Sequence, residues 1–236
     1  MKAPIILAVD TSDFQTAISW IKATEDSVSI YKLGLEFYLN FGATGVAEII
    51  ERTGAQIFLD LKLHDIPHTV GGAAKAIAHL NPVFLTVHAS GGRAMISAAA
   101  QAAPDVAVTA VTILTSLADS DLFEIGYANP ALESAVALAK MAVGSGAKAL
   151  VCSPLETAAI RSAVGSEAII ITPGVRPLAE QGGDDQVRTM TPGDAIAAGA
   201  NFVVIGRPIT NSWSDGTSAM SAKARLIADE ILSALA

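Results

Sequence analysis

The chain has 236 residues, of which 51% are hydrophobic and 16% are charged. A chain of this length buries roughly 70–75% of its unfolded surface, so its core needs no metal or disulfide, and its composition excludes disordered, collagen-like and disulfide-scaffold proteins. Its formal net charge of −8 argues against a general surface for nucleic acid or for an anionic membrane, although a local basic pocket can still hold an anionic ligand.

Short apolar runs alternate with longer, alanine-rich segments along the chain. Eight runs are present, at residues 5–10, 29–33, 56–62, 83–88, 106–112, 149–152, 168–172 and 202–205. They are continuously apolar, as strands are when helices cover both faces of a parallel sheet. Eight β-then-α units without a dividing linker predict an α/β fold that closes into one (β/α)8 TIM barrel, a single domain over residues 1–236. An open doubly wound sheet is the structural alternative.

Helix boundaries are marked by capping residues and by glycines. The segment Thr11-Ser12-Asp13 is expected to cap a helix that runs through Trp20, and Ser153-Pro154 has the cap-then-proline form of another helix start. Three glycines stand a few residues before an apolar run, as glycines at helix C-termini do: Gly54, Gly146 and Gly199.

The sequence also indicates a compartment. The N-terminal apolar run is short and stops at Asp10, without the cleavage pattern of a secretory signal, and no uncharged stretch reaches the ~18–20 residues of a transmembrane helix. The single cysteine, Cys152, cannot form an intramolecular disulfide and is interpreted as a small apolar core residue. We therefore expect a soluble, cytoplasmic protein that binds neither nucleic acid nor membrane.

Polar residues gather where the predicted strands end. In a barrel of this kind the active site lies at the carboxyl ends of the strands, so these residues are candidates for it. In chain order these polar residues are Asp10, Lys32, Asp60, Lys62, Asp65, His88, Thr112, Thr115, Thr172 and Arg207, and Pro173 and Gly206 stand beside them at the seventh and eighth strand ends.

The third strand end carries the most informative segment, Leu59–Thr69. Residues two apart on a strand face the same side, so Asp60 and Lys62 are both expected to point into the barrel mouth. An ammonium held between carboxylates can stabilise a carbanion and deliver a proton to it. A plain ion pair that closes the barrel end is the alternative, but it does not account for a second lysine, Lys32, on the neighbouring strand.

The spacing Asp60-x-Lys62-x-x-Asp65 resembles the signature of the orotidine 5′-monophosphate decarboxylase suprafamily, and the fuller segment 60–69 is similar to the form found in the decarboxylases themselves. Other matching segments follow in order along nearly the whole chain: Asp10, Tyr31–Gly34, Val111–Ser116, Thr172–Pro177 and Val204–Thr210.

This resemblance implies decarboxylation of orotidine 5′-monophosphate to uridine 5′-monophosphate, the last step of de novo pyrimidine nucleotide synthesis, without a cofactor or metal. Lys62 would stabilise and protonate the carbanion at C6 of the pyrimidine, beside Asp60 near the substrate carboxylate. Asp10 and Lys32 would bind ribose hydroxyls, with Lys32 also bracing Asp60.

The resemblance implies further contacts, including some across a subunit boundary. Asp65 and Thr69 would reach into the neighbouring subunit's site, so a homodimer is expected. Thr115 would lie against the pyrimidine, and Pro173 would lie among the substrate-binding residues.

The phosphate is expected beside the seventh and eighth strands, a recurrent location in these barrels. Gly206 permits close backbone approach and Arg207 can pair with phosphate oxygens. Arg176 begins a loop, 177–191, which is interpreted as a lid over the phosphate. The phosphate-binding glutamine of the family usually follows Gly-Asp directly, whereas one residue is inserted here, so Gln186 is the first candidate and Gln181 the second.

Two other functions stay open at this point. The first is that of a suprafamily relative that acts on sugar phosphates through a magnesium-bound enediolate, such as a keto-gulonate phosphate decarboxylase. Such relatives carry an acidic, metal-associated residue where Lys32 stands, and the chain lacks the usual histidine and cysteine metal-binding spacings. The second is a non-catalytic nucleotide-binding barrel, which the complete set Asp60, Lys62 and Asp65 disfavours.

Overall fold

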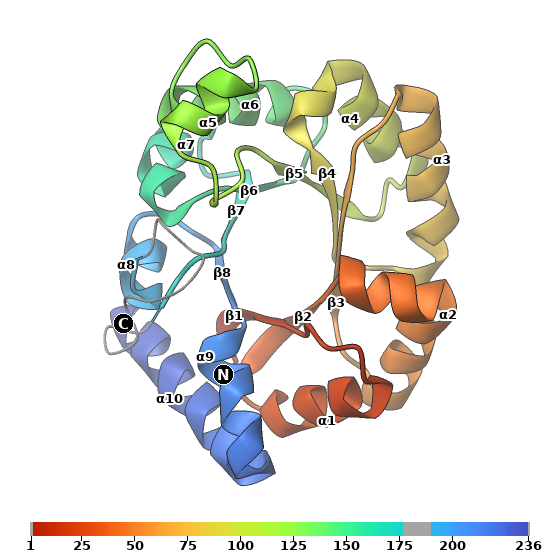
Figure 1. Cartoon of the computed structure of the whole chain (residues 1–236), viewed down its shortest axis with the longest axis vertical. Coiled ribbons are helices and arrows are strands. Elements are labelled where there is room, and N and C mark those ends of the chain that lie inside the picture. The colour runs from red at the N-terminus through yellow and green to blue at the C-terminus, as the bar shows by residue number, and fades with distance from the viewer. Residues whose placement is uncertain (1, 177–189, 236) are drawn as a thin grey trace.

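The structure of the protein, a computed structural model, describes residues 2–176 and 190–235. Within these residues eight parallel strands pair in chain order, and the last pairs with the first, so that the sheet closes into a barrel (Figure 1). The strands are β1 (Ala3–Ala8), β2 (Val28–Gly34), β3 (Ile57–Leu63), β4 (Phe84–His88), β5 (Ala107–Val111), β6 (Ala149–Val151), β7 (Ile169–Thr172) and β8 (Phe202–Ile205). The predicted single-domain (β/α)8 barrel is confirmed, and each predicted strand end lies within two residues of the observed one. That the domain runs over residues 1–236 stays a prediction.

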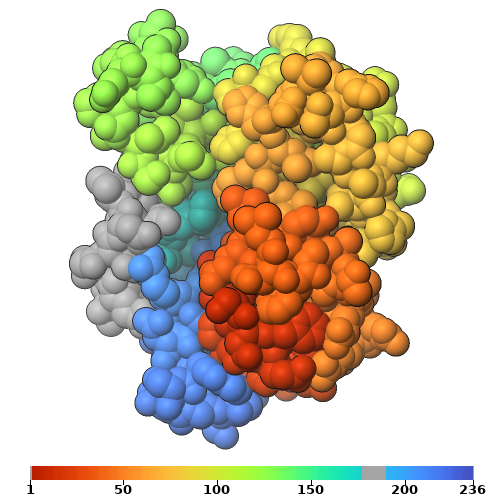
Figure 2. Space-filling view, turned by 45° about the vertical axis from the view of Figure 1, so that its right-hand side comes forward, coloured from red at the N-terminus to blue at the C-terminus, as the bar shows by residue number. Residues whose placement is uncertain are grey.

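Helices surround the barrel as an outer layer (Figure 1). They are α1 (Phe14–Thr24), α2 (Leu35–Thr53), α3 (Pro67–Ile77), α4 (Gly92–Ala102), α5 (Asp119–Glu124), α6 (Ala131–Val143), α7 (Thr157–Val164), α8 (Pro192–Ala197), α9 (Arg207–Thr210) and α10 (Thr217–Ala234). The first and last parts of the chain lie side by side where the barrel closes (Figure 2). In the part of the chain that the structure describes, no helix is long and apolar enough to cross a membrane.

The capping residues act as predicted, with two differences. The carboxylate of Asp13 accepts a hydrogen bond from the backbone N–H of Thr16 at 2.6 Å, but α1 continues to Thr24 instead of ending near Trp20. Ser153 caps a short 3-10 turn, Pro154–Glu156, which leads into α7, so the predicted helix begins a few residues later. Gly54 ends α2 in the left-handed conformation, with φ 66°.

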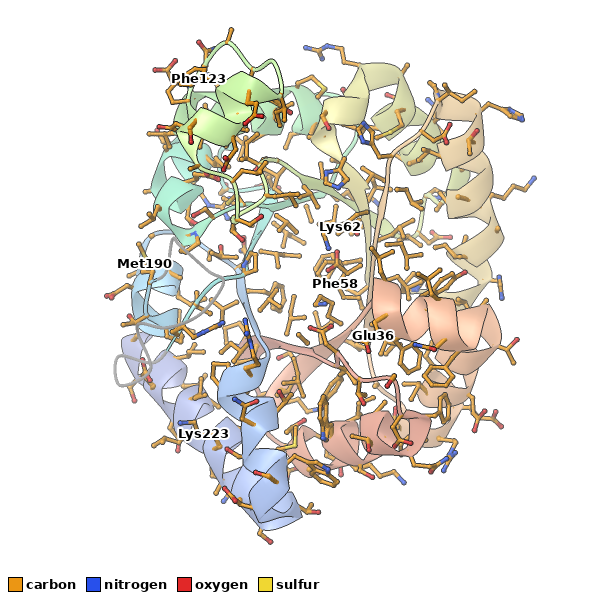
Figure 3. The ribbon with its side chains drawn as sticks, in the orientation of Figure 1. Glu36, Phe58, Lys62, Phe123, Met190 and Lys223 are labelled. Carbon is orange, nitrogen blue, oxygen red and sulfur yellow. The ribbon has the colours of Figure 1, made fainter. Side chains whose placement is uncertain are left out.

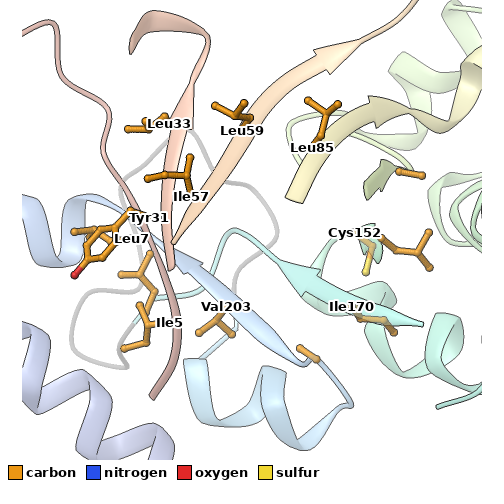
Figure 4. Packing of buried hydrophobic residues seen from close by; sticks show 14 of the residues in the cluster. Ile5, Leu7, Tyr31, Leu33, Ile57, Leu59, Leu85, Cys152, Ile170 and Val203 are labelled. Carbon is orange, nitrogen blue, oxygen red and sulfur yellow. The ribbon is translucent and has the colours of Figure 1, made fainter. Parts of the chain in front are cut away.

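Alternate residues of each strand face two separate hydrophobic cores. One set packs between the strands and the surrounding helices, as Ile5, Leu7, Leu33 and Leu59 do (Figure 4). The other set fills the barrel interior: Ile6, Ile30, Phe58, Phe84, Ala149 and Ile171. Burial on both faces explains why the strands are continuously apolar in sequence.

The barrel interior changes from apolar to polar along its axis. The rings of Phe58 and Phe84 pack edge to face with centroids 5.6 Å apart. Two residues further along their strands, on the same face, stand Asp60 and Thr86, which are buried. The interior packing therefore forms a floor beneath the polar carboxyl ends of the strands.

Candidate active site

A cavity of about 320 Å³ opens at the carboxyl ends of the strands. This volume lies in the range of roughly 300–1,000 Å³ typical of small-molecule sites. Nine of the residues predicted from the sequence line it: Asp10, Lys32, Asp60, Lys62, Thr115, Pro173, Arg176, Gly206 and Arg207. Mostly apolar residues supply the rest of the wall, and both Phe58 and Lys62 lie toward the middle of the barrel (Figure 3).

Four charged side chains form an alternating array along one wall of this cavity. Lys32 Nζ lies 3.1 Å from Asp10 Oδ1 and 3.5 Å from Asp60 Oδ2. Lys62 Nζ lies 2.8 Å from the same Asp60 Oδ2. Each carboxylate therefore neighbours an ammonium, and Asp60 stands between two of them.

Burial and neighbouring charges act in opposite directions on this array. Burial lowers the pKa of Lys32, but the carboxylates of Asp60 and Asp10 outweigh it and hold that pKa above its ordinary value. Burial raises the pKa of Asp60, while Lys32, Lys62 and a hydrogen bond from Thr86 bring it below its ordinary value. Asp60 and Lys32 are therefore both charged at neutral pH.

The approach of Lys62 to Asp60 depends on an irregular backbone. Sequence reasoning assumed a regular strand, but Lys62 has a positive φ of 49° and the pairing of β3 with β4 shifts register between Leu59 and Leu63. Thr86, on β4, joins the two residues, since its hydroxyl donates to Asp60 Oδ1 at 3.0 Å and accepts from the Lys62 N–H at 2.8 Å. Sequence analysis missed Thr86, although its place two residues before His88 puts it on the inward face of the strand.

His88 stands at the end of β4 but does not line the cavity. Its ring centroid lies 5.4 Å from that of His64. Burial, followed by the nearby His64 and Lys62, lowers the pKa of His88. The imidazole of His88 is therefore neutral at pH 7, and it adds no charge to the array.

Asp65 and Thr69 lie outside this cavity. Both are exposed, as are all residues from His64 to Thr69, and the Asp65 carboxylate accepts a hydrogen bond from the N–H of Ile66 at 2.7 Å. Within the described residues no salt bridge joins Asp65 to Lys62. The single chain thus brings Asp60 to the lysine, and Asp65 stays on the rim.

Two arginines, which follow β7 and β8, also line the cavity. Arg207 begins α9 directly after Gly206, and Arg176 is buried with Nη1 donating to the Val175 carbonyl at 3.1 Å. The N–H of Arg176 donates to the carbonyl of Met190 at 2.9 Å. Gln181, Gln186 and the interior of the predicted lid, 177–189, lie outside the described residues.

The described part of the chain contains no cluster of metal ligands. Within residues 2–176 and 190–235 no three His, Cys, Asp or Glu side chains gather closely enough to hold a metal ion. In the array itself, the ammonium groups of Lys32 and Lys62 occupy the positions beside Asp60.

Comparison with known proteins extends these observations. Residues 3–222 match the family described as "Orotidine 5'-phosphate decarboxylase / HUMPS family". An orotidine 5′-phosphate decarboxylase from Thermobifida fusca is 49% identical over 226 residues, covering 96% of this chain and 97% of the relative. One from Frankia casuarinae is 44% identical over 244 residues, covering 96% of this chain and 89% of the relative.

Solved structures are similar over almost the whole chain as well. A crystal structure of orotidine 5′-phosphate decarboxylase from Lactobacillus acidophilus has a TM-score of 0.83 at 34% identity, covering 98% of this chain and 99% of that chain. An uncharacterised conserved protein from Geobacillus kaustophilus has a TM-score of 0.79 at 30% identity, covering 95% of this chain and 99% of that chain.

Proposed function

The chain belongs to the orotidine 5′-phosphate decarboxylase / HUMPS family, and we propose that it converts orotidine 5′-monophosphate to uridine 5′-monophosphate and carbon dioxide. This reaction completes pyrimidine nucleotide synthesis. The observation that carries the proposal is the Lys62 ammonium held 2.8 Å from the buried carboxylate of Asp60, inside a cavity of nucleotide size.

The charge array suits a reaction that passes through a carbanion. When the bond between C6 and the carboxylate carbon breaks, its electron pair stays on C6 and carbon dioxide leaves. The Lys62 ammonium, already fixed by Asp60, stabilises that charge and transfers its proton to C6; solvent then reprotonates the lysine. A positioned general acid contributes about 10²–10⁴-fold, and a preorganised charge contributes about 10²–10³-fold. Because the ammonium is fixed before substrate arrives, little reorganisation accompanies the reaction.

The other lining residues fit the parts of the nucleotide. Asp10 and Lys32 bind ribose hydroxyls, since a carboxylate accepts and an ammonium donates at the same edge of the cavity. Thr115 lies against the pyrimidine, and Pro173 lines the cavity nearby.

The phosphate is held on the arginine side of the cavity. Arg176 and Arg207 supply donors for its oxygens, and Gly206 presents no side chain to it. Gln186 is the further phosphate ligand of the proposal, with Gln181 as the second candidate.

We also propose a homodimer in which Asp65 and Thr69 complete the partner's site. The support is the run of exposed residues 64–69, in which Ile66 is 64% exposed. Leu35 and Leu39, which follow the neighbouring strand β2, are 48% and 82% exposed. Large exposed apolar side chains often mark protein–protein interfaces. Here they lie near a cavity that Asp65 of the same chain does not line, which favours a subunit interface at this rim. A cytoplasmic location accompanies the proposal and rests on the lone, buried Cys152.

The alternative of a magnesium-dependent sugar-phosphate enzyme is disfavoured by Lys32. Its ammonium lies between Asp10 and Asp60, where it opposes the binding of a divalent cation to those carboxylates. The test follows the loss of orotidine absorbance in the ultraviolet with and without a chelator. We expect equal loss in both samples. No loss of absorbance in either sample would reject the proposed function and favour a non-catalytic barrel, and loss that the chelator abolishes would favour the metal-dependent mechanism.

A further inference from the structure

We propose that Thr86 is a positioning residue for this reaction: its hydroxyl holds the Asp60 carboxylate and the Lys62 backbone in the geometry that aims the Lys62 ammonium. This inference rests on the proposed function for its kinetic consequence. Its structural basis is separate and consists of the contacts between β3 and β4.

The Thr86 hydroxyl makes two hydrogen bonds to the same short segment of β3. It donates to Asp60 Oδ1 at 3.0 Å and accepts from the Lys62 N–H at 2.8 Å. A hydroxyl has one donor and two acceptor positions, so both kinds of bond can form at once. Thr86 is fully buried, so water has little access to its hydroxyl. One side chain thus fixes both members of the Asp60–Lys62 pair.

The bond to the Lys62 N–H takes the place of a regular hydrogen bond between β3 and β4, whose pairing is interrupted here. Leu59 pairs with Leu85 and Leu63 pairs with Val87, so four steps along β3 correspond to two along β4. Lys62 lies inside this bulge with φ 49°, a conformation that residues other than glycine seldom adopt. Its N–H has left the regular ladder and donates to the Thr86 hydroxyl instead, in a partly buried position where an unpaired backbone donor is unfavourable. The hydroxyl therefore supports the unusual backbone that carries the lysine.

The same hydroxyl fixes the orientation of the Asp60 carboxylate. Oδ1 accepts from Thr86, and Oδ2 accepts from Lys62 Nζ at 2.8 Å. Oδ1 is thus engaged from β4 and Oδ2 from Lys62 on the same strand as Asp60, so rotation of the carboxylate plane would break these bonds. Without the Thr86 bond, only ammonium groups would hold the Asp60 carboxylate. An ammonium has three rotatable donors, so it fixes the orientation of a carboxylate less strictly than the Thr86 hydroxyl does.

Thr109 provides a matched control. It lies on β5 directly opposite Thr86 in the pairing of β4 with β5, and it is equally buried. Its hydroxyl donates to the carbonyl of Ala107, on its own strand, at 2.9 Å. Thr109→Val therefore removes a buried hydroxyl from the neighbouring position in the barrel without touching the charge array.

The experiment compares steady-state kinetics of Thr86→Val, Thr86→Ser and Thr109→Val with the unmodified protein. Because misplacing a reacting group by about 1 Å costs on the order of 10²-fold, we expect Thr86→Val to lower kcat about 10- to 100-fold. KM should change less than about threefold, since the lost interaction acts on the transition state. Thr86→Ser should retain most of kcat, and Thr109→Val should match the unmodified protein. A purely packing role predicts the reverse order, with valine tolerated better than serine, and that order would overturn the inference.

A second readout separates this inference from the proposed function. Hydrogen exchange of the Lys62 amide should be faster in Thr86→Val than in Thr86→Ser, whatever reaction the protein catalyses. Equal exchange in the two variants would overturn the inference even if the protein decarboxylates the nucleotide. If Thr86→Val does not fold, Thr86→Ala replaces it, because alanine and serine differ only by the hydroxyl in question.

Discussion

Gly34 lies directly against the ammonium of Lys32. A Cβ added at Gly34 would lie 3.2 Å from Lys32 Nζ and 3.5 Å from Asp10 Oδ1. Gly34 ends β2 and precedes α2, so the chain turns away from the barrel at the point where Lys32 bridges two carboxylates. A side chain at this position would press on the bridging ammonium, which is why glycine suits it.

We expect Gly34→Ala to lower kcat/KM roughly tenfold. A misplacement of a reacting group by ~1 Å costs on the order of 10²-fold in rate, and the added methyl group should displace the Lys32 ammonium by only a fraction of that distance. The matched control is Gly72→Ala in α3, where a Cβ meets no atom within 4 Å. Because alanine is favoured over glycine inside a helix by roughly 0.5–1 kcal/mol, this control should be neutral or slightly stabilising. Equal kinetics in the two variants would show that Lys32 tolerates the methyl group.

Removing Arg207 should weaken binding through the phosphate. A hydrogen bond to a charged group is worth about 1.5–3 kcal/mol, so Arg207→Ala should weaken nucleotide binding about 10- to 150-fold. Orotidine, which lacks the phosphate, serves as the control substrate and should be processed equally by both proteins. The measurement is kcat/KM for each substrate. An equal loss for both would assign Arg207 a structural role.

The shared site can be tested by mixing two inactive variants, Lys62→Ala and Asp65→Ala, and refolding them together. In a mixed dimer one site carries both changes, and the other pairs an intact Lys62 with an intact Asp65. Random pairing makes about half of the dimers mixed, so about one quarter of all sites should recover. The activity of the refolded mixture is compared with that of each variant refolded alone. Mixed dimers without recovered activity would contradict a site built from two chains.

The free energy of unfolding should depend on pH because Asp60 and Lys32 each contribute to stability only in their charged forms. The pKa of Asp60 is lowered in the fold, so its contribution is present above its unfolded pKa of about 3.9 and is lost as pH falls through the lower folded value. The pKa of Lys32 is raised, so its contribution is present below its unfolded pKa of about 10.4 and is lost as pH rises through the higher folded value.

The measurement is urea unfolding of the unmodified protein and of Asp60→Asn from acidic to alkaline pH. The difference in free energy of unfolding should stay flat between about pH 5 and pH 9 and shrink below about pH 4. A difference that persists unchanged in acid would show that Asp60 does not keep its charge in the folded protein.

Sequence predicted the strands and the barrel because burial on both faces leaves a continuous apolar run that needs no partner to be recognised. It also predicted that Asp10, Lys32, Asp60 and Lys62 meet, since the strand ends of a closed parallel barrel share one mouth. The bulge at Lys62 was not predicted, because it arises from the register between β3 and β4, a property of two distant segments.

The roles of Thr86 and Gly34 were missed for a related reason. Each depends on a contact that local spacing does not encode: a hydroxyl across the sheet in the first case, and the reach of the Lys32 side chain in the second. Asp65 is the reverse case. The resemblance implies that it acts in the neighbouring subunit's site, whereas in the single chain it is an exposed residue outside the cavity.

In the proposed reaction the Lys62 ammonium drives decarboxylation without a metal. The most direct measurement is the rate of uridine 5′-monophosphate formation from orotidine 5′-monophosphate, with a chelator present, for the unmodified protein and for Lys62→Ala. We predict full activity for the unmodified protein and a loss of at least about 10⁴-fold for a variant that remains folded by circular dichroism, since Lys62 serves as both charge stabiliser and acid. A folded Lys62→Ala variant that keeps more than a few per cent of the activity would contradict the account.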